Sequence, residues 1–277
     1  MSALPDLHPE AQPADLEELA HRFAATIEGA RAVAVAFSGG VDSSVTVALA
    51  VRALGRERVT AVIGVSPSLS QAELQQARAT ARSLGVECRE VPTHELDDPD
   101  YVANRGNRCY FCKFELYTQA FGEGVDALGC DVFVNGDTAD DHRSPDRPGR
   151  RAATELGVRS PLAEAGIGKA EVRALARSLG LAVWDKPSAP CLASRVPVDT
   201  PVTRERLAQI ERAEAGLRDL GLRRLRVRHH GSTARIELGP EELAAVQGPG
   251  VRHQVLRAVT DAGYGDVEIA DRALERS

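Results

Sequence analysis

Hydrophobic and polar positions alternate over the first two hundred residues in the manner of a parallel α/β protein. Apolar runs of strand length lie at residues 32–37, 59–65, 86–91, 131–135 and 181–184. Segments with helical spacing lie between or beside them, at residues 13–28, 42–54, 70–84, 112–121 and 169–179. Because strands that alternate with helices in this way form right-handed crossovers, we expect a parallel sheet with helices on both faces. Ligands bind at the carboxyl ends of such strands, so Gly64 and Ser66 are candidate ligand contacts.

The pattern changes near residue 200. The chain continues with a charged amphipathic helix at residues 203–220 and with two alternating strands, at residues 222–229 and 233–238, that are joined by a turn. Two further helices and a closing strand at residues 266–270 follow. We therefore expect two domains, one of the α/β class over residues 14–199 and a small α+β domain over residues 200–277. The small domain is expected to contribute to substrate binding and to contacts between subunits.

Composition narrows the functional classes. The 277 residues carry a formal net charge of -6, which does not favour a general attraction to nucleic acid or anionic membranes, although a local basic patch is compatible with it. No apolar run reaches membrane-spanning length, and the first fifteen residues lack a signal-peptide pattern, so we expect a cytoplasmic protein. Five cysteines in a reducing compartment indicate thiols, metal ligands or catalytic groups rather than a disulfide framework.

The stretch AVAVAFSGGVDSS, residues 32–44, joins a buried strand to a helix through two glycines. Gly39 and Gly40 have no Cβ, so a turn there lets backbone N–H groups approach an anion, and the helix N-terminus opened by Ser43 and Ser44 favours phosphate. A carboxylate in a phosphate cradle is repulsive unless a cation lies between, so we interpret Asp42 as a Mg²⁺ ligand. The alternative is an ordinary strand-to-helix turn that happens to contain two glycines.

Three cysteines are candidates for chemistry. Cys109 and Cys112 form a CxxC at the start of a helix, and Cys191 lies in a proline-braced loop between Lys186 and Arg195. The two cationic neighbours predict a lowered pKa for the Cys191 thiol. The prolines of the loop limit its freedom and would hold this nucleophile in position. CxxC alone is also typical of a zinc half-site, completed by His94 or His142, or of a redox pair. Three cysteines at one cavity would suit an iron–sulfur cluster with one iron free of protein thiolate, able to carry a sulfide. Cys88 and Cys130 are interpreted as core residues.

Two groups of arginines are candidate anion contacts. A polar loop over residues 136–152 is too long for a simple connector and contains Arg147, Arg150 and Arg151, which would neutralise phosphate or carboxylate groups or else form a solvated basic loop. Arg226 and Arg228 alternate along one strand face, so both guanidinium groups can meet a single phosphate.

SGGVDSS resembles the PP-loop, the pyrophosphate-binding signature of ATP-dependent adenylating enzymes. Together with RCYFCK, the RPGRR loop and PCLASR, it is similar to the LarE-type ATP-dependent sulfur transferases, over roughly residues 16–269. The resemblance implies the fold of the PP-loop ATP pyrophosphatases (adenine nucleotide α-hydrolase-like) with a small C-terminal domain. It also implies adenylation of a carboxylate of pyridinium-3,5-biscarboxylic acid mononucleotide and its conversion to a thiocarboxylate, for the nickel-pincer nucleotide cofactor.

The resemblance also assigns roles to residues of this chain. ATP and Mg²⁺ would be bound by the motif Ser38, Gly39, Gly40, Asp42, Ser43 and Ser44. Gly64 and Ser66, expected at a strand end from the sheet topology alone, would then contact the adenine. Divalent cation contacts would come from Asp42, Asp140, Asp141 and Glu214. Substrate would be bound by Arg147, Arg150, Arg151, Arg195, Arg226 and Arg228. The cysteines Cys109, Cys112 and Cys191 would hold a [4Fe-4S] cluster, as in the three-cysteine branch of the family, whereas the one-cysteine branch sacrifices the sulfur of the residue matching Cys191.

Two other functions remain open. Some PP-loop enzymes that thiolate tRNA also use a CxxC with a distant cysteine, and the arginines of residues 218–228 form a local basic patch. The acidic net charge and the lack of an added RNA-binding domain argue against that alternative. The second alternative is a protein that binds ATP for regulation, without turnover. We expect a homo-oligomer that passes its product to a nickel-inserting enzyme.

Overall fold

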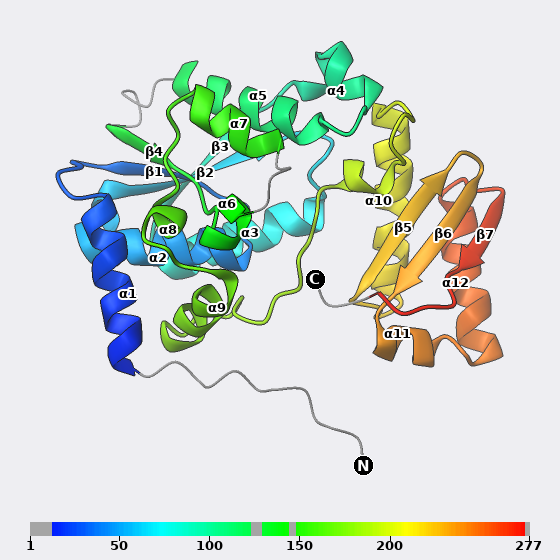
Figure 1. Cartoon of the computed structure of the whole chain (residues 1–277). Helices are drawn as coiled ribbons and strands as arrows, with labels where there is room; N and C mark the ends of the chain where they lie inside the picture. The colour runs from blue at the N-terminus through cyan, green and yellow to red at the C-terminus, as the bar shows by residue number, and fades with distance from the viewer. Residues whose placement is uncertain (1–12, 123–128, 144–147, 275–277) are drawn as a thin grey trace.

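Two sheets organise the chain in the computed structural model, which describes residues 13–122, 129–143 and 148–274 (Figure 1). The first sheet has the order β3-β2-β1-β4, and every neighbouring pair is parallel. Its strands are β1 (Val33–Ala36), β2 (Val59–Val65), β3 (Glu87–Pro92) and β4 (Val132–Val134). The expectation of an α/β domain with a parallel sheet is thereby confirmed.

Helices cover both faces of this sheet because the central strand β1 is apolar on both sides. Val33 and Val35 pack with α1 (Pro13–Thr26), α2 (Val41–Leu54), α3 (Gln71–Leu84) and α9 (Lys169–Ser178). Ala34 and Ala36 face the other way, against α5 (Arg108–Gly122) and α7 (Pro148–Glu155). Side chains alternate across a strand, so a run without polar residues is what a strand buried on both faces requires.

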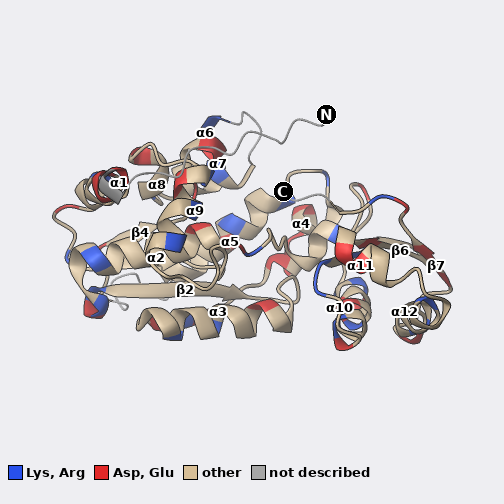
Figure 2. Ribbon diagram, turned by 90° about the horizontal axis from the view of Figure 1, so that it is seen from below, with Lys and Arg blue, Asp and Glu red and all other residues tan. Residues whose placement is uncertain are grey.

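The second sheet lies beside the first in the yellow-to-red part of the chain (Figure 1). It has the order β5-β6-β7, in which the first pair is antiparallel and the second parallel. Its elements are α10 (Arg204–Asp219), β5 (Leu225–His230), β6 (Thr233–Leu238), α11 (Pro240–Ala245), α12 (Pro249–Asp261) and β7 (Asp266–Ile269). Charged side chains lie along α10 and α12, whereas the ribbon of β2 in the first sheet carries none (Figure 2).

A small apolar cluster joins the two parts. Leu192 and Val196, from the segment after Cys191, pack there with Leu207 and Ile210 of α10 and with Tyr101. Because α10 contributes to this cluster and to the core of the second sheet, the domain boundary at residue 200 stays a prediction. Among the residues described, no helix is long and apolar enough to cross a membrane.

Several predicted elements differ in the structure. Residues 181–184 form turns rather than a strand, because Leu181 N–H and Trp184 N–H donate to carbonyls earlier in the chain and only Val183 is fully buried. The loop predicted over residues 136–152 contains α6 (Ala139–Arg143) and the start of α7. β5 begins at Leu225 instead of Leu222. Short helices fill the segments left irregular, namely η1 (Arg56–Arg58), η2 (Glu95–Asp97), α4 (Pro99–Ala103), α8 (Pro161–Glu164) and η3 (Leu192–Arg195).

Candidate functional site

The turn between β1 and α2 has the backbone shape that its glycines predict. Gly39 has φ +68°, and a Cβ there would lie 2.7 Å from the Cα of Ala77, so a larger residue would be both strained and crowded. Gly40 precedes the first helical residue of α2 in an extended conformation. The hydroxyls of Ser38 and Ser43 lie 3.2 Å apart and brace the turn. Backbone N–H groups at the start of α2 are therefore available to an anion.

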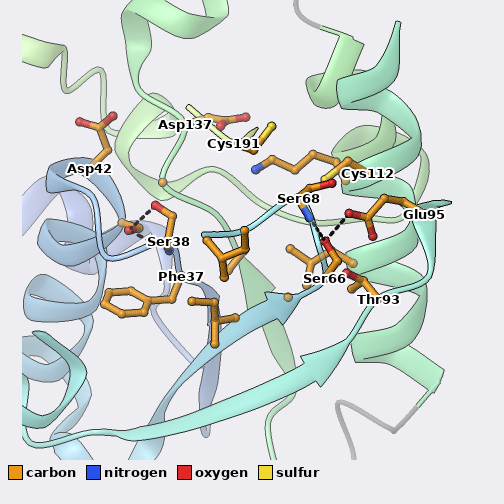
Figure 3. Close-up of a pocket in the computed structure, with 18 of the residues that line it drawn as sticks. Phe37, Ser38, Asp42, Ser66, Ser68, Thr93, Glu95, Cys112, Asp137 and Cys191 are labelled. Atoms are coloured by element: carbon orange, nitrogen blue, oxygen red, sulfur yellow. Dashed lines mark hydrogen bonds between the residues drawn. The ribbon is translucent and has the colours of Figure 1, made fainter. Parts of the chain in front are cut away.

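A cavity of about 320 Å³ opens at the carboxyl ends of β1 and β2, beside this turn (Figure 3). Most of the predicted residues for nucleotide and sulfur chemistry line it, namely Ser38, Asp42, Ser43, Gly64, Ser66, Asp141, Cys112 and Cys191. The side chains of Phe37, Ile63, Leu69 and Leu116 form its apolar wall. In the close-up Asp42 and Glu95 lie at opposite ends, so one cavity joins the turn to the thiols.

Two carboxylates and a lysine meet at the turn end of the cavity. The Nζ of Lys169 lies 3.5 Å from Asp42 Oδ2 and 3.5 Å from Asp141 Oδ1. Burial raises the pKa of the Asp42 carboxyl, an effect that Lys169 opposes and the charge of Asp141 reinforces. Asp141 also accepts hydrogen bonds from the N–H and hydroxyl of Thr138. Oxygen ligands facing one another in this way suit a hard divalent cation.

Asp140 has a different position from its neighbour. Its carboxylate accepts a hydrogen bond from the backbone N–H of Lys169 at 2.7 Å and pairs with Arg143 at 2.9 Å. It does not line the cavity that Asp42 and Asp141 share. The acidic pair predicted to bind a cation is thus divided, with Asp141 at the cavity and Asp140 at the start of α9.

Two of the three candidate cysteines, Cys112 and Cys191, line the other side of the cavity, and Cys109 lies three residues before Cys112 in α5. Cys109 and Cys112 lie in the first turns of α5, and the loop carrying Cys191 is held in place by the Leu192 N–H, which donates to the Ser68 carbonyl at 2.8 Å. Besides burial, the charge of Cys109 raises the pKa of the Cys112 and Cys191 thiols, and the charge of Cys191 raises the pKa of the Cys112 thiol, which indicates that the three residues are neighbours. Figure 3 shows Cys112 and Cys191 in the same wall.

The pKa of the Cys191 thiol shifts in the opposite direction from the one predicted. Although the residue has an exposed surface, desolvation by the surrounding protein raises the pKa of its thiol, and the nearby Arg108 and Arg195 only partly offset this. Lys186 does not serve the thiol, because its Nζ donates to Glu73 and to the Gly39 carbonyl. Burial, followed by the charge of Glu95, likewise raises the pKa of the Cys112 thiol.

Arg195 and Glu214 form a buried ion pair instead of separate ligand contacts. Glu214 is fully buried and accepts hydrogen bonds from Arg195, Arg218 and the Val227 N–H. Arg195 also donates to the carbonyls of the loop at Pro190 and Cys191. Neither side chain lines the cavity with Asp42. Their geometry fastens the cysteine loop to the second sheet, and the predicted cation contact of Glu214 gains no support.

The strand arginines lie beside that ion pair. Arg228 donates to Glu237 and to the Ser194 carbonyl, and it lines a second cavity of about 290 Å³ together with Arg195 and Arg235. Burial and the neighbouring charges of Arg195 and Arg228 lower the pKa of Arg226. Cationic groups that destabilise one another provide a favourable site for an anion.

Arg150 and Arg151, the described arginines of the basic loop, line neither cavity. Arg150 donates to the His142 carbonyl, and Arg151 stacks 4.0 Å from the ring centroid of Tyr110 while pairing with Glu155. Arg147 lies outside the described residues. Burial raises the pKa of the thiols of Cys88 and Cys130, which lie in or beside apolar clusters, as expected for core residues.

Sequence reasoning missed several polar residues of the first cavity, among them Lys169, Lys113 and Glu95. Lys169 opens α9, Lys113 follows the CxxC and donates to the Tyr117 hydroxyl, and Glu95 is 2% exposed with its Oε2 lacking a hydrogen-bond partner. The sequence RCYFCK already placed Lys113 one residue from Cys112, whereas nothing local singled out Lys169 or Glu95. Both depend on how distant segments meet.

The two ends of the main cavity offer donor atoms that suit different metal groups. Within the described part of the chain, no three His, Cys, Asp or Glu side chains form a ready-made metal site. Two opposed carboxylates beside a phosphate turn nevertheless match the ligands of a cation that shares coordination with a nucleotide. Cys112 and Cys191 line the same cavity and match the thiolate donors of an iron–sulfur cluster in chemical type, whereas Cys109 does not line it.

Comparisons with known proteins cover most of the chain. The family model described as NAD synthase matches residues 21–101, which include the β1–α2 turn. An uncharacterised protein of Synechocystis is 46% identical over 76% of this chain and 77% of its own length. The pyridinium-3,5-bisthiocarboxylic acid mononucleotide synthase of Lactiplantibacillus plantarum is 37% identical over 77% of both chains. The NH3-dependent NAD⁺ synthetase of Pyrobaculum aerophilum is 46% identical over only 25% of this chain and 26% of its own.

Proposed function

Because the chain belongs to the family of the pyridinium-3,5-bisthiocarboxylic acid mononucleotide synthase, we propose that it is an ATP-dependent sulfur transferase acting on pyridinium-3,5-biscarboxylic acid mononucleotide. One observation carries the proposal: a single cavity contains a phosphate-binding turn at one end and Cys112 and Cys191 in its wall. Activation by a nucleotide and delivery of sulfur can therefore occur at the same carbonyl group.

The chemistry has two balanced steps. A substrate carboxylate oxygen bonds to the α-phosphorus of ATP while the bond to pyrophosphate breaks, which gives an acyl-adenylate. Sulfur then attacks the activated carbonyl, and AMP leaves with one former carboxylate oxygen. Backbone N–H groups of the turn and the cation Lys169 stabilise the phosphates. A bound Mg²⁺, held by Asp42 and Asp141, would supply charge neutralisation to the phosphates.

The thiols are proposed as the source or carrier of the sulfur. Cys109, Cys112 and Cys191 would hold a [4Fe-4S] cluster, whose remaining iron would supply a place for a sulfide that is passed on. The other route spends the sulfur of Cys191 itself. The gathering of three thiols, two of them in the cavity wall, supports the cluster, because a sacrificial route needs only one.

The remaining assignments concern the substrate phosphate and the adenosine. Arg226 and Arg228 would bind the substrate phosphate, since both are half-buried on one strand face beside Arg195. Gly64 and Ser66 would lie along the adenosine. We further propose that the protein is cytoplasmic, where its thiols stay reduced, and that it acts as a homo-oligomer that hands its product to a nickel-inserting enzyme.

The test uses anaerobically purified protein. Incubated with ATP, Mg²⁺ and the biscarboxylate mononucleotide, it should release pyrophosphate and AMP and form a product in which sulfur has replaced oxygen, as seen by mass spectrometry. Bound iron and acid-labile sulfide with an unchanged protein mass would support the cluster. Loss of one H₂S from Cys191 would support the sacrificial route. Sulfur found only in added tRNA, or ATP binding without pyrophosphate release, would overturn the proposal.

A further inference from the structure

The ammonium group of Lys169 lies between two carboxylates from different parts of the fold. Its Nζ is 3.5 Å from Asp42, at the start of α2, and 3.5 Å from Asp141, at the start of α6. The lysine is held there by its own backbone, because its N–H donates to Asp140 and the capping contact of Glu171 with Gly168 fixes the start of α9. The fold therefore sets the position of the Lys169 backbone, whereas its side chain is 49% exposed.

The two carboxylates need a cation to stay together. Each carboxylate lies 3.5 Å from the same Nζ, and the side chain of Asp141 is only 8% exposed, so two like charges stand close together in partial burial and repel one another. The single charge of Lys169 offsets part of this repulsion in the nucleotide-free protein. At 3.5 Å each contact is long for a charge-assisted hydrogen bond, so the pairing is exchangeable.

We propose that Lys169 is a positioning residue that occupies the place of the divalent cation until nucleotide arrives. This inference rests on the proposed function, because it takes Asp42 and Asp141 to be the cation ligands. The ammonium leaves the carboxylates when the cation enters with ATP, and it then faces the incoming phosphates. The consequence is an order of binding: the free protein has weak affinity for the cation alone, and cation and nucleotide bind together.

The experiment measures Mn²⁺ binding directly, by the loss of the electron paramagnetic resonance signal of free Mn²⁺. In the unaltered protein, Mn²⁺ should bind weakly alone and tightly with the unreactive nucleotide α,β-methylene ATP. In Lys169→Met, the Kd for Mn²⁺ without nucleotide should fall by at least about tenfold, as expected from loss of two partly exposed ion pairs. Adding Asp42→Asn to that variant should return the Kd to its weak value.

Arg173→Met is the matched control. Arg173 lies one turn further along α9 and also acts on the charge of Asp42, yet it pairs with neither carboxylate and donates to the Trp184 carbonyl. Its removal should change the Mn²⁺ affinity by less than about threefold. If Arg173→Met strengthens binding as much as Lys169→Met, general electrostatics explains the effect and the placeholder role is wrong.

Other outcomes are equally decisive. Should Lys169→Met melt like the unaltered protein yet bind Mn²⁺ no more tightly, the inference fails; Lys169→Gln gives a second variant if the first is unstable. New binding that survives Asp42→Asn would place the cation elsewhere and also contradict it. Failure of the proposed function has a separate signature, namely no Mn²⁺–nucleotide complex and no pyrophosphate release in the unaltered protein.

Discussion

The two ends of the main cavity are built in opposite ways. The backbone of the phosphate end comes from consecutive residues, Ser38 to Ser44, which form one strand–turn–helix unit, and the side chains of Asp141 and Lys169 reach it from elsewhere. The thiol end is assembled from α5 and from a loop much later in the chain, fastened by Ser68 and by the Arg195–Glu214 ion pair. A local site depends on its own residues, whereas an assembled site also depends on distant contacts that hold its parts together.

The largest expected effect comes from the local end. Asp42→Ala should lower pyrophosphate release by about 1,000-fold or more, because it removes a cation ligand at the transferring phosphate, and the thiocarboxylate product should disappear with it. Pyrophosphate release is the measurement. Asp140→Ala, in which the neighbouring carboxylate outside the cavity is lost, should cost less than about tenfold. Equal losses would mean that the division of the acidic residues is wrong.

The second effect separates the two ends. Cys191→Ala should abolish the thiocarboxylate while pyrophosphate release stays within about threefold, since activation does not use the thiol. Product is followed by mass spectrometry, and bound iron should fall in parallel. Cys88→Ala, in β3, is the matched control and should retain both product and iron. Full product formation by Cys191→Ala would remove the thiol end from the chemistry.

The third prediction concerns the support of the thiol end. Glu214→Gln leaves Arg195 without its countercharge at a position 5% exposed, and unfolding free energy should fall by about 3 kcal/mol, measured by urea denaturation. Glu237→Gln breaks the more exposed pair with Arg228 and should cost at most about 1 kcal/mol. A loss no larger in Glu214→Gln than in this control would show that the buried pair does not hold the loop.

The smallest effect tests a link between the ends. Lys186 lies on the cysteine-bearing segment and donates to the Gly39 carbonyl of the phosphate turn and to Glu73. Lys186→Met should lower unfolding free energy by about 1–2 kcal/mol and raise the KM for ATP a few-fold. Arg52→Met removes the exposed partner of Glu17 and serves as the control. An unchanged KM would indicate that the two ends are independent.

The contrast between a local and an assembled end also explains which parts of the structure could be predicted from the sequence. β1, the glycine turn and α2 follow from one contiguous pattern, since a continuous apolar run, positive φ and helix propensity all act over a few residues. The parallel sheet follows from repetition of that unit. Residues 181–184 look like a strand because Leu181 and Val183 are apolar, but no strand in the described part of the chain pairs with them, and pairing is not visible in a single segment.

Several of the residues that sequence reasoning missed or misplaced depend on a distant partner. Lys169 reaches Asp42 only because α9 packs on α2, and Arg195 meets Glu214 only because α10 lies under the cysteine loop. The pKa of Cys191 was expected to fall from its basic neighbours along the chain. In space one of those neighbours, Lys186, is paired elsewhere, and desolvation has the larger effect.

The strand order has a consequence for how the protein is made. β1 pairs with β2 soon after it in the chain, but its other edge is covered by β4, which begins roughly a hundred residues later. At ribosomal rates of about 5–20 residues per second, that edge stays open for on the order of 5–20 seconds during synthesis. An apolar strand with unpaired backbone groups is a template for aggregation. During this interval of synthesis, the yield of folded protein depends on whether a chaperone covers the open edge. In refolding from denaturant, slow dilution would serve the same purpose.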